Sequence, residues 1–216
     1  MHYKAVLFDM DVTLINSVDD IADAMNQVLQ QNHLPTHPVK KYCDWIGDGM
    51  KNLVITALPV NKREDVFINK YLEEMKAAYS DMWMNKTHLY PGIPDLLTVL
   101  RKRNIKMAIL SNKPHRFTQI IADKLLTEWN FDVVMGYREG FLRKPDPSSA
   151  LEIARQINID PAFFLYLGDS AIDIITAINA GMYPVGVSWG YRSTNSLLES
   201  GAQKIIYNPN ELLSLF

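Results

Sequence analysis

Short apolar runs alternate with helical patterns through the second half of the chain, and this alternation constrains the fold more than any other feature. Six runs have the continuous apolar character of strands buried on both faces: residues 5–8, 106–110, 131–135, 164–167, 184–187 and 204–207. Helical spacing appears between the later runs, at residues 93–102, 114–126, 148–157, 172–180 and 194–199. The sequence therefore predicts an α/β protein with a doubly wound parallel sheet, a Rossmann-like core.

Residues 16–87 interrupt this alternation with helical periodicity and no convincing strand. One apolar stripe has 3.6-residue spacing (Val18, Ile21, Ala22, Met25, Val28, Leu29), and a second follows later (Phe67, Tyr71, Met75, Tyr79, Met82). Ser17 and Asp20 have the spacing of a capping box at the start of the first helix. We therefore expect a core domain of residues 1–15 and 88–216 with a helical cap domain inserted at 16–87.

Composition excludes several classes of protein. The chain has 216 residues, 48% hydrophobic and 21% charged, which is typical of a globular protein with a full core. A net charge of -2 offers no broad basic surface, so we expect no nucleic-acid partner. Cys43 is the only cysteine, which fits a reducing, cytoplasmic compartment. Asp9 and Asp11 interrupt the apolar start, and no run approaches the roughly 18 residues of a membrane span, so we expect no membrane partner.

Two aspartates follow the first predicted strand. Asp9 and Asp11 come directly after the run 5–8, and in open parallel sheets ligands bind at the carboxyl ends of strands. An extended chain through Met10 would point both carboxylates to one side, where they repel each other unless a metal, a cation or a shared proton intervenes. Taken alone, the two residues could also be turn or helix-cap aspartates.

Ser111, Asn112 and Lys144 stand near two further junctions between strand and helix. Pro114 suits the first position of a helix, which would leave Ser111 and Asn112 in a turn whose backbone N–H groups can hold an anion. A plain helix cap is the alternative for that turn. Lys144, in a loop with two prolines, would matter only if the fold brings it beside the carboxylates.

A third carboxylate follows the run 164–167. Ser170 and Asp173 have the spacing of a capping pair, an account that leaves Asp169 unexplained. Beside Asp9 and Asp11, Asp169 would complete an oxygen-only cluster of the kind that suits Mg²⁺. The sequence therefore predicts a Mg²⁺ site at the carboxyl edge of the sheet.

Together these segments resemble the four motifs of the haloacid dehalogenase superfamily, phosphatase branch. The matching segments are Asp9-Met10-Asp11-Val12-Thr13, Ser111-Asn112, Lys144-Pro145 and Gly168-Asp169-Ser170 with Asp173. The helical insertion resembles the mobile cap of that family's first subclass. Four further segments resemble the phosphoglycolate phosphatases in particular: Trp45-Ile46-Gly47-Asp48-Gly49, Leu89-Tyr90-Pro91-Gly92, Asn112-Lys113-Pro114 and Trp189-Gly190-Tyr191.

The resemblance implies a catalytic mechanism with an aspartyl-phosphate intermediate. Asp9 would be the nucleophile, and Asp11 would be the general acid and then the base that activates water. Ser111 and Asn112 would bind phosphoryl oxygens, while Lys144 balances their charge.

The same resemblance implies a set of metal ligands. Mg²⁺ would be held by the Asp9 carboxylate, the backbone carbonyl of Asp11 and Asp169, with Asp173 steadying the metal site from nearby. One position departs from the family, which usually has glycine where this chain has Val12. Either Val12 has a negative φ, or the activity is compromised.

We therefore expect a Mg²⁺-dependent phosphomonoesterase that acts on a small phosphorylated metabolite, with phosphoglycolate as the first candidate. A sugar phosphomutase of the same family is one alternative. A receiver-type signalling module is another, because it also combines an aspartate, a Ser or Thr and a lysine on a doubly wound sheet. The third alternative is a catalytically weakened binding or regulatory homologue. The oligomeric state cannot be read from the sequence.

Overall fold

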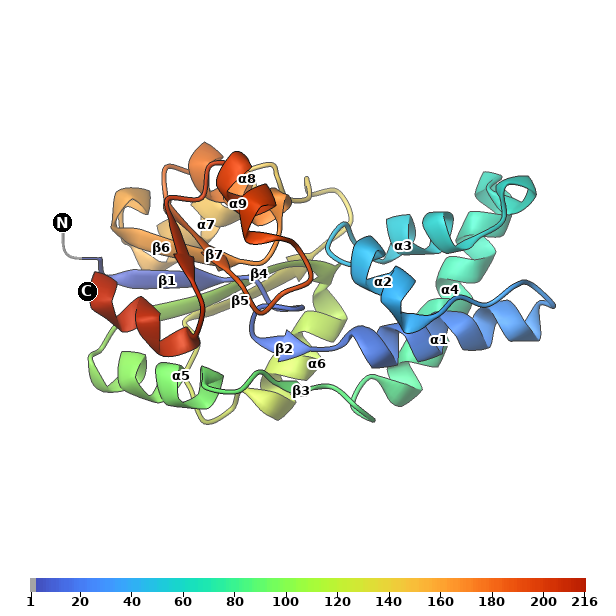
Figure 1. Cartoon of the computed structure of the whole chain (residues 1–216), viewed down its shortest axis with the longest axis horizontal. Helices are drawn as coiled ribbons and strands as arrows, with labels where there is room; N and C mark the ends of the chain where they lie inside the picture. Colours follow the sequence, from blue (N-terminus) through green and yellow to red (C-terminus); the bar gives the residue numbers. More distant parts are fainter. Residues whose placement is uncertain (1–2) are drawn as a thin grey trace. The chain divides into compact units, whose positions relative to one another are not determined.

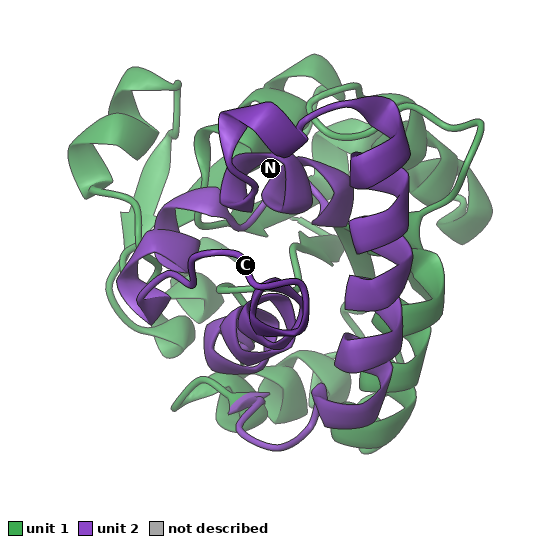
Figure 2. Cartoon of the chain, turned by 90° about the vertical axis from the view of Figure 1, so that its right-hand side faces the viewer, with its two compact units in different colours: residues 1–15, 89–216 green, residues 16–88 purple. Residues whose placement is uncertain are grey.

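The computed structural model describes residues 3–216 and divides the chain into two compact units. Unit 1 contains residues 1–15 and 89–216, and unit 2 contains residues 16–88 (Figure 2). The chain passes between them at β2 (Ile15–Asn16) and β3 (His88–Leu89), which pair as a two-stranded sheet. The assignment of the two units as catalytic core and cap stays a prediction.

Unit 1 is built on a six-stranded parallel sheet in the order β5-β4-β1-β6-β7-β8. Its strands are β1 (Ala5–Phe8), β4 (Lys106–Pro114), β5 (Val133–Tyr137), β6 (Phe164–Gly168), β7 (Tyr183–Val187) and β8 (Lys204–Ile206). The predicted doubly wound α/β fold is confirmed. β5 begins at residue 133, two residues later than the predicted strand.

Helices cover both faces of this sheet (Figure 1). On one face lie α7 (Ser148–Ile157) and α8 (Ala171–Asn179), and on the other lie α5 (Ile93–Lys102) and α6 (His115–Leu125). α9 (Thr194–Glu199) packs on α8, β7 and β8, η3 (Pro209–Leu215) packs on α5, and η2 (Pro161–Phe163) precedes β6. All four residues of β1 are fully buried, because alternate side chains face the two helical layers.

The order of the strands reverses beside β1. β1 lies between β4 and β6, with Ala5 paired to Lys106 on one side and to Phe164 on the other. The chain goes from β1 to β4 and β5 and then returns to the opposite side of β1. Such a reversal of strand order opens a crevice at the carboxyl ends of the strands, which is where the predicted site residues lie.

Unit 2 is helical. It contains α1 (Val18–Gln31), α2 (Val39–Trp45), α3 (Met50–Ala57), η1 (Val60–Lys62) and α4 (Asp65–Met82). α1 packs on α2 and α4, and α3 packs on the same two helices. The apolar stripe predicted on α1 is buried, and from the second stripe Tyr71, Met75 and Tyr79 are buried on α4. Among residues 3–216, no helix combines the length and the apolar character needed to cross a membrane.

The capping box predicted for Ser17 and Asp20 is wrong. Ser17 precedes α1, but its side chain makes no capping hydrogen bond. The buried Asp20 carboxylate instead accepts hydrogen bonds from the backbone N–H of Lys86 at 3.0 Å, and from the backbone N–H and hydroxyl of Thr87 at 2.8 and 2.7 Å. The Asp20 side chain, which local spacing assigned to a helix cap, therefore binds a segment more than 60 residues away in the sequence.

The turn predicted at Ser111 and Asn112 is also wrong. β4 continues through Pro114, which is the residue before α6 rather than its first residue. The pairing of β4 with β5 shifts register between Ser111 and Pro114, and such a bulge re-aims side chains at the end of a strand. Ser111 and Asn112 therefore lie on an irregular strand end and not in a turn.

Candidate active site

Lys144 is the centre of the site that these strand ends form. Its ammonium Nζ donates to Asp9 Oδ1 at 2.7 Å, to Asp173 Oδ1 at 2.6 Å and to the carbonyl of Leu110 at 3.2 Å. The side chain is 3% exposed, so these contacts replace its hydration. The fold thus does bring Lys144 beside Asp9, which is the condition that its sequence position left open.

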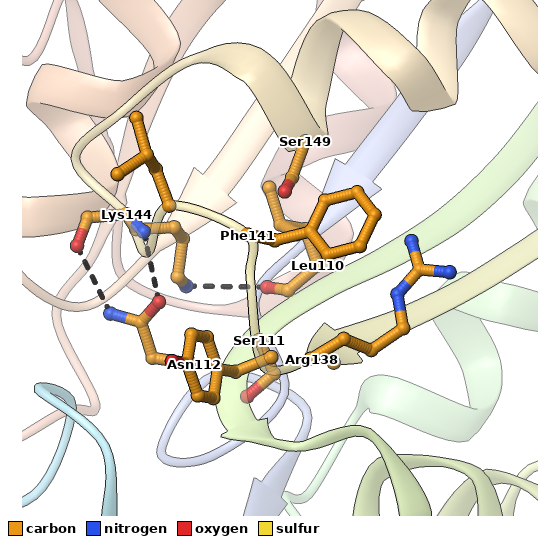
Figure 3. A pocket seen from close by; sticks show the side chains of 10 residues that line it. Leu110, Ser111, Asn112, Arg138, Phe141, Lys144 and Ser149 are labelled. Carbon is orange, nitrogen blue, oxygen red and sulfur yellow. Dashed lines mark hydrogen bonds between the residues drawn. The ribbon is translucent and has the colours of Figure 1, made fainter.

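Asn112 fixes the loop that carries Lys144. Its side-chain amide donates to the Lys144 carbonyl at 3.2 Å, and its Oδ1 accepts from the Lys144 backbone N–H at 2.9 Å. Figure 3 shows this pair of bonds together with the bond from Lys144 Nζ to Leu110. Leu110, Asn112 and Lys144 line a small pocket, and Ser111 lies beside Asn112 on its wall. Asn112 therefore positions Lys144 through two hydrogen bonds to its backbone, a role that its sequence position did not indicate.

Asp9 is a buried carboxylate with only one oxygen engaged. Lys144 bonds to Oδ1, and Asp9 Oδ2 accepts no hydrogen bond from residues 3–216. Burial raises the pKa of the Asp9 carboxyl to about 7, with Lys144 lowering it and Asp173 raising it. One oxygen is thus left for a metal or an electrophile.

Asp173 has two structural partners besides Lys144. Its Oδ2 accepts from the Ser170 hydroxyl at 2.5 Å, and the Asp173 backbone N–H donates back to that hydroxyl, so the predicted capping pair at the start of α8 is present. Tyr166 donates its hydroxyl to Asp173 Oδ1 at 3.5 Å. Both Asp173 oxygens thus already have a donor, so this carboxylate holds Lys144 in place and also adds negative charge beside Asp9 and Asp169.

Burial alone lowers the pKa of the Lys144 ammonium, but the adjacent Asp173 and Asp9 carboxylates outweigh it and hold that pKa well above its ordinary value. Burial raises the pKa of the Asp169 carboxyl well above its ordinary value, with Asp173 and Asp9 adding to the effect. Arg192 and Lys144 oppose this rise only in part, so the three buried carboxylates carry more negative charge than Lys144 alone balances.

The residues present fit a hard divalent cation. Oxygen atoms of Asp9, Asp169 and Asp173 lie within 4.8 Å of one another. The Asp169 carboxylate is 8% exposed and has no hydrogen-bond donor within the described part of the chain, which leaves both of its oxygens for a ligand. Mg²⁺ prefers oxygen ligands, and these carboxylates offer oxygen atoms whose negative charge the protein does not fully balance.

The segment after β7 fixes the surroundings of Asp169. A Cβ on Gly190 would lie 2.5 Å from the Asp169 Cβ, closer than real contacts allow, so only glycine fits there. The neighbouring Trp189 donates its indole N–H to the Thr13 carbonyl at 3.1 Å. This segment therefore touches both the loop that follows Asp9 and the third carboxylate.

Lys113 is a charged residue of the site that sequence reasoning did not assign a role. Its Nζ donates to both oxygens of Asp11, at 2.9 and 3.1 Å, and the two side chains are 4% and 10% exposed. The sequence signals for it are its place directly after Ser111-Asn112 and the resemblance of Asn112-Lys113-Pro114 to phosphoglycolate phosphatases, neither of which indicates a contact with Asp11. Asp11 is thus held by its own lysine and does not share Lys144.

Val12 lies in the left-handed region at φ 69°, so the alternative of a negative φ is wrong. Its side chain is fully buried, and its backbone N–H donates to the Ile15 carbonyl at 2.7 Å. A β-branched residue resists this conformation at a cost of about 1–3 kcal/mol, which the surrounding packing must offset. The loop after Asp9 therefore adopts the conformation that glycine would allow, but with strain.

The site thus combines Asp9 after the first strand of a parallel sheet, Lys144 held against Asp9, and Asp169 at a further strand end. This arrangement is the one expected of a hydrolase of the family that the sequence resembles. The family model of the haloacid dehalogenase-like hydrolases matches residues 6–187. This chain belongs to the haloacid dehalogenase-like hydrolase family.

Several relatives of this chain have names that are more specific. The chain is 30% identical over 213 residues to phosphoglycolate phosphatase 1 of Pseudomonas aeruginosa, covering 97% of this chain and 78% of the relative. It is 34% identical over 197 residues to the phosphoglycolate phosphatase of Psychrobacter arcticus, covering 88% and 86%. A crystal structure of a putative phosphoglycolate phosphatase from Lactobacillus delbrueckii subsp. bulgaricus superposes with a TM-score of 0.91 at 30% identity, covering 98% and 97%.

Proposed function

We propose that this hydrolase is a Mg²⁺-dependent phosphomonoesterase and that phosphoglycolate is its first candidate substrate. The observation that carries the proposal is the arrangement of Asp9, whose Oδ1 is fixed by Lys144 while Oδ2 is left open. A carboxylate held in this way can attack phosphorus without first losing a partner. The names of the relatives support phosphoglycolate.

In the first half-reaction, an Asp9 oxygen would bond to phosphorus while the bond to the ester oxygen breaks. The departing alkoxide needs a proton, which Asp11 would supply. Ser111, Asn112 and Lys144 would bind the phosphoryl oxygens and balance their charge.

In the second half-reaction, Asp11 would take a proton from water as the water oxygen bonds to phosphorus. The bond between Asp9 and phosphorus breaks, and inorganic phosphate leaves. Bound Mg²⁺ would supply charge compensation between the anionic nucleophile and the phosphate. Asp9, Asp169 and the Asp11 backbone carbonyl would hold it, with Asp173 in a supporting role.

The remaining parts of the proposal concern the wider molecule. Residues 16–87 would act as the substrate-selecting cap, since this helical unit is inserted directly after the Asp9 loop. The single cysteine fits a cytoplasmic location, and the net charge of -2 gives no support for a nucleic-acid partner.

A hydrolysis screen of small phosphate esters, with and without Mg²⁺, tests the proposal. We expect phosphoglycolate hydrolysis that excess chelator abolishes. Asp9→Asn keeps the shape of the side chain but removes the anionic nucleophile, so the rate should fall by several orders of magnitude. The matched control is Asp123→Asn, an exposed aspartate of α6, which should retain the rate.

Three outcomes would contradict the proposal. Full activity in chelator or in Asp9→Asn would remove the metal or the nucleophile from the mechanism. Stable phosphorylation of Asp9 after acetyl phosphate treatment, without turnover, would favour the signalling module. Interconversion of sugar phosphates without net release of phosphate would favour the phosphomutase.

A further inference from the structure

The ion pair between Lys113 and Asp11 has a geometry that limits how Asp11 can move. The ammonium contacts both carboxylate oxygens, at 2.9 and 3.1 Å, so rotation of the carboxylate would break one contact. Both side chains are buried, and water cannot replace the lost contact at low cost. The pair therefore fixes the direction in which the Asp11 oxygens point.

The backbone around Lys113 is held as firmly as its side chain. The register shift of β4 lies between Ser111 and Pro114 and thus includes Lys113. The Lys113 N–H donates to Ser111 Oγ at 3.2 Å. A Cβ on Gly136 of β5 would lie 2.7 Å from the Lys113 carbonyl oxygen, so the two strands approach as closely as glycine permits. Lys113 is therefore a rigid link between the Ser111-Asn112 strand end and Asp11.

We propose that Lys113 is a positioning residue for Asp11 in the step that hydrolyses the aspartyl-phosphate. The inference rests on the proposed function, because it assigns a partner to the proposed base. In that step Asp11 is the proposed base, so its oxygens have to face the attacking water, and the two contacts from Lys113 fix where they face. The water oxygen bonds to phosphorus, one water proton moves to the Asp11 carboxylate, and the bond from phosphorus to Asp9 breaks.

The first half-reaction can be made independent of this contact. Asp11 takes part in it only as the proposed donor of a proton to the leaving group. A substrate whose leaving group needs no proton therefore removes Asp11, and with it Lys113, from the first step. Para-nitrophenyl phosphate is such a substrate, since nitrophenolate leaves as an anion.

Rapid mixing with para-nitrophenyl phosphate separates the two steps. An activated nitrophenyl ester is used so that formation of the aspartyl-phosphate is the faster step; the first turnover then appears as a burst of nitrophenolate, and the later steady rate reports hydrolysis of the aspartyl-phosphate. Lys113→Met keeps most of the side-chain length and removes the charge. We expect its burst rate to stay within about threefold of the original and its steady rate to fall about 10–100-fold, the scale of a base displaced by up to 1 Å. Equal slowing of both phases, or of neither, would overturn the proposal.

Lys106→Met is the matched control. Lys106 lies on the same strand and pairs with Asp132, but it is about half exposed. Both kinetic phases should be unchanged in that variant, because the pair that it removes lies at the opposite end of β4.

A double-mutant cycle keeps the proposal testable even if Lys113→Met alone fails to fold. Asp11→Asn with Lys113→Met removes both members of the pair and leaves no buried charge unpaired. If Lys113 acts only through Asp11, adding Lys113→Met to Asp11→Asn should change the steady rate by less than about threefold. A further loss as large as that expected of Lys113→Met alone would overturn the positioning role. An unmodified enzyme that hydrolyses no phosphate ester would instead refute the proposed function.

Discussion

Two segments of this chain have the same local spacing, Ser-x-x-Asp at the start of a helix, and the structure uses them differently. At Ser170 and Asp173 the capping box is present, and the Asp173 carboxylate also holds Lys144 at 2.6 Å. At Ser17 and Asp20 the capping bonds are absent, and Asp20 binds the backbone of Lys86 and the backbone and hydroxyl of Thr87.

The comparison shows that the Ser-x-x-Asp spacing allows a capping box, and that contacts with distant parts of the chain decide whether the aspartate makes it. Asp173 both caps α8 and holds Lys144, because α8 begins at the carboxyl end of β6, where Lys144 arrives. Asp20 lies at the start of α1 and binds Lys86 and Thr87, near the end of unit 2, so its contacts hold two parts of the chain together. Loss of Asp173 should therefore affect chemistry first, and loss of Asp20 should affect stability first.

The largest effect is expected from Asp173→Asn. The change keeps the shape of the side chain but removes the charge that holds Lys144, so Lys144 and the neighbouring carboxylates lose their arrangement. Supporting residues of a metal site typically contribute 10–100-fold in metal affinity or activity, and we expect a loss of about that size in both. Calorimetric titration with Mg²⁺ and a turnover assay check it. An unchanged Mg²⁺ affinity would mean that Asp173 only caps α8.

Asp20→Ala should have the opposite profile. It leaves the part-buried backbone N–H of Lys86 and the buried backbone N–H and hydroxyl of Thr87 without their acceptor, which we expect to lower the free energy of unfolding by about 2–3 kcal/mol. Turnover at 25 °C should change by less than about threefold. Denaturant titration and a turnover assay measure the two quantities. Asp23→Ala, at an exposed partner of Lys86, is the control and should leave the melting temperature unchanged. A fall in turnover without a fall in stability would break the comparison.

Ser170→Ala tests whether the cap of α8 also supports the proposed metal site. The hydroxyl accepts from the Asp173 N–H as a cap and donates to Asp173 Oδ2, so its loss should lower the free energy of unfolding by about 1 kcal/mol. It should also weaken Mg²⁺ binding, because Asp173 is less well fixed. Ser193→Ala removes the equivalent cap from α9 and should match the stability loss with no effect on Mg²⁺. Identical Mg²⁺ affinities in the two variants would show that Ser170 caps α8 without supporting the metal site.

The smallest effect is expected at Val12. Here the fold holds a β-branched residue at a positive φ, against its ordinary backbone preference. Val12→Gly relieves the strain at φ 69° but gives the unfolded chain more freedom, so the two contributions to stability largely cancel. We expect kcat/KM to rise by at least threefold, roughly 0.6 kcal/mol in the barrier, as the loop relaxes around the phosphoryl group. A smaller change would show that valine is merely tolerated.

The fold could be predicted because buried parallel strands need continuous apolar runs. Residues 5–8 form a strand with the predicted bounds, and the helices over residues 93–102, 148–157 and 194–199 also match. The errors lie where a contact distant in sequence decides, as at Asp20, or where pairing with a neighbouring strand extends an element, as between Ser111 and Pro114. Local propensity contains neither kind of information.

The site could be predicted only as a set of residues near one edge of the sheet. The sequence indicated Asp9, Asp169 and Lys144, and the structure brings them together. The pairing of each lysine could not be read, because Lys113 and Lys144 are equally basic in sequence and only the bulge in β4 and the loop held by Asn112 assign them to different aspartates. The catalytic and metal-binding roles of these residues stay predictions.

The indole of Trp189 gives the protein a built-in optical reporter. Its N–H bonds to the carbonyl of Thr13, in the loop that follows Asp9, so we expect its emission to change when that loop changes. Trp129, bonded to Thr98 in the same unit, supplies a reference indole away from the loop. With Trp45 and Trp83 replaced by phenylalanine, a change in the fluorescence of unit 1 on adding Mg²⁺ or phosphate would report, without any attached dye, whether the loop after Asp9 responds to them.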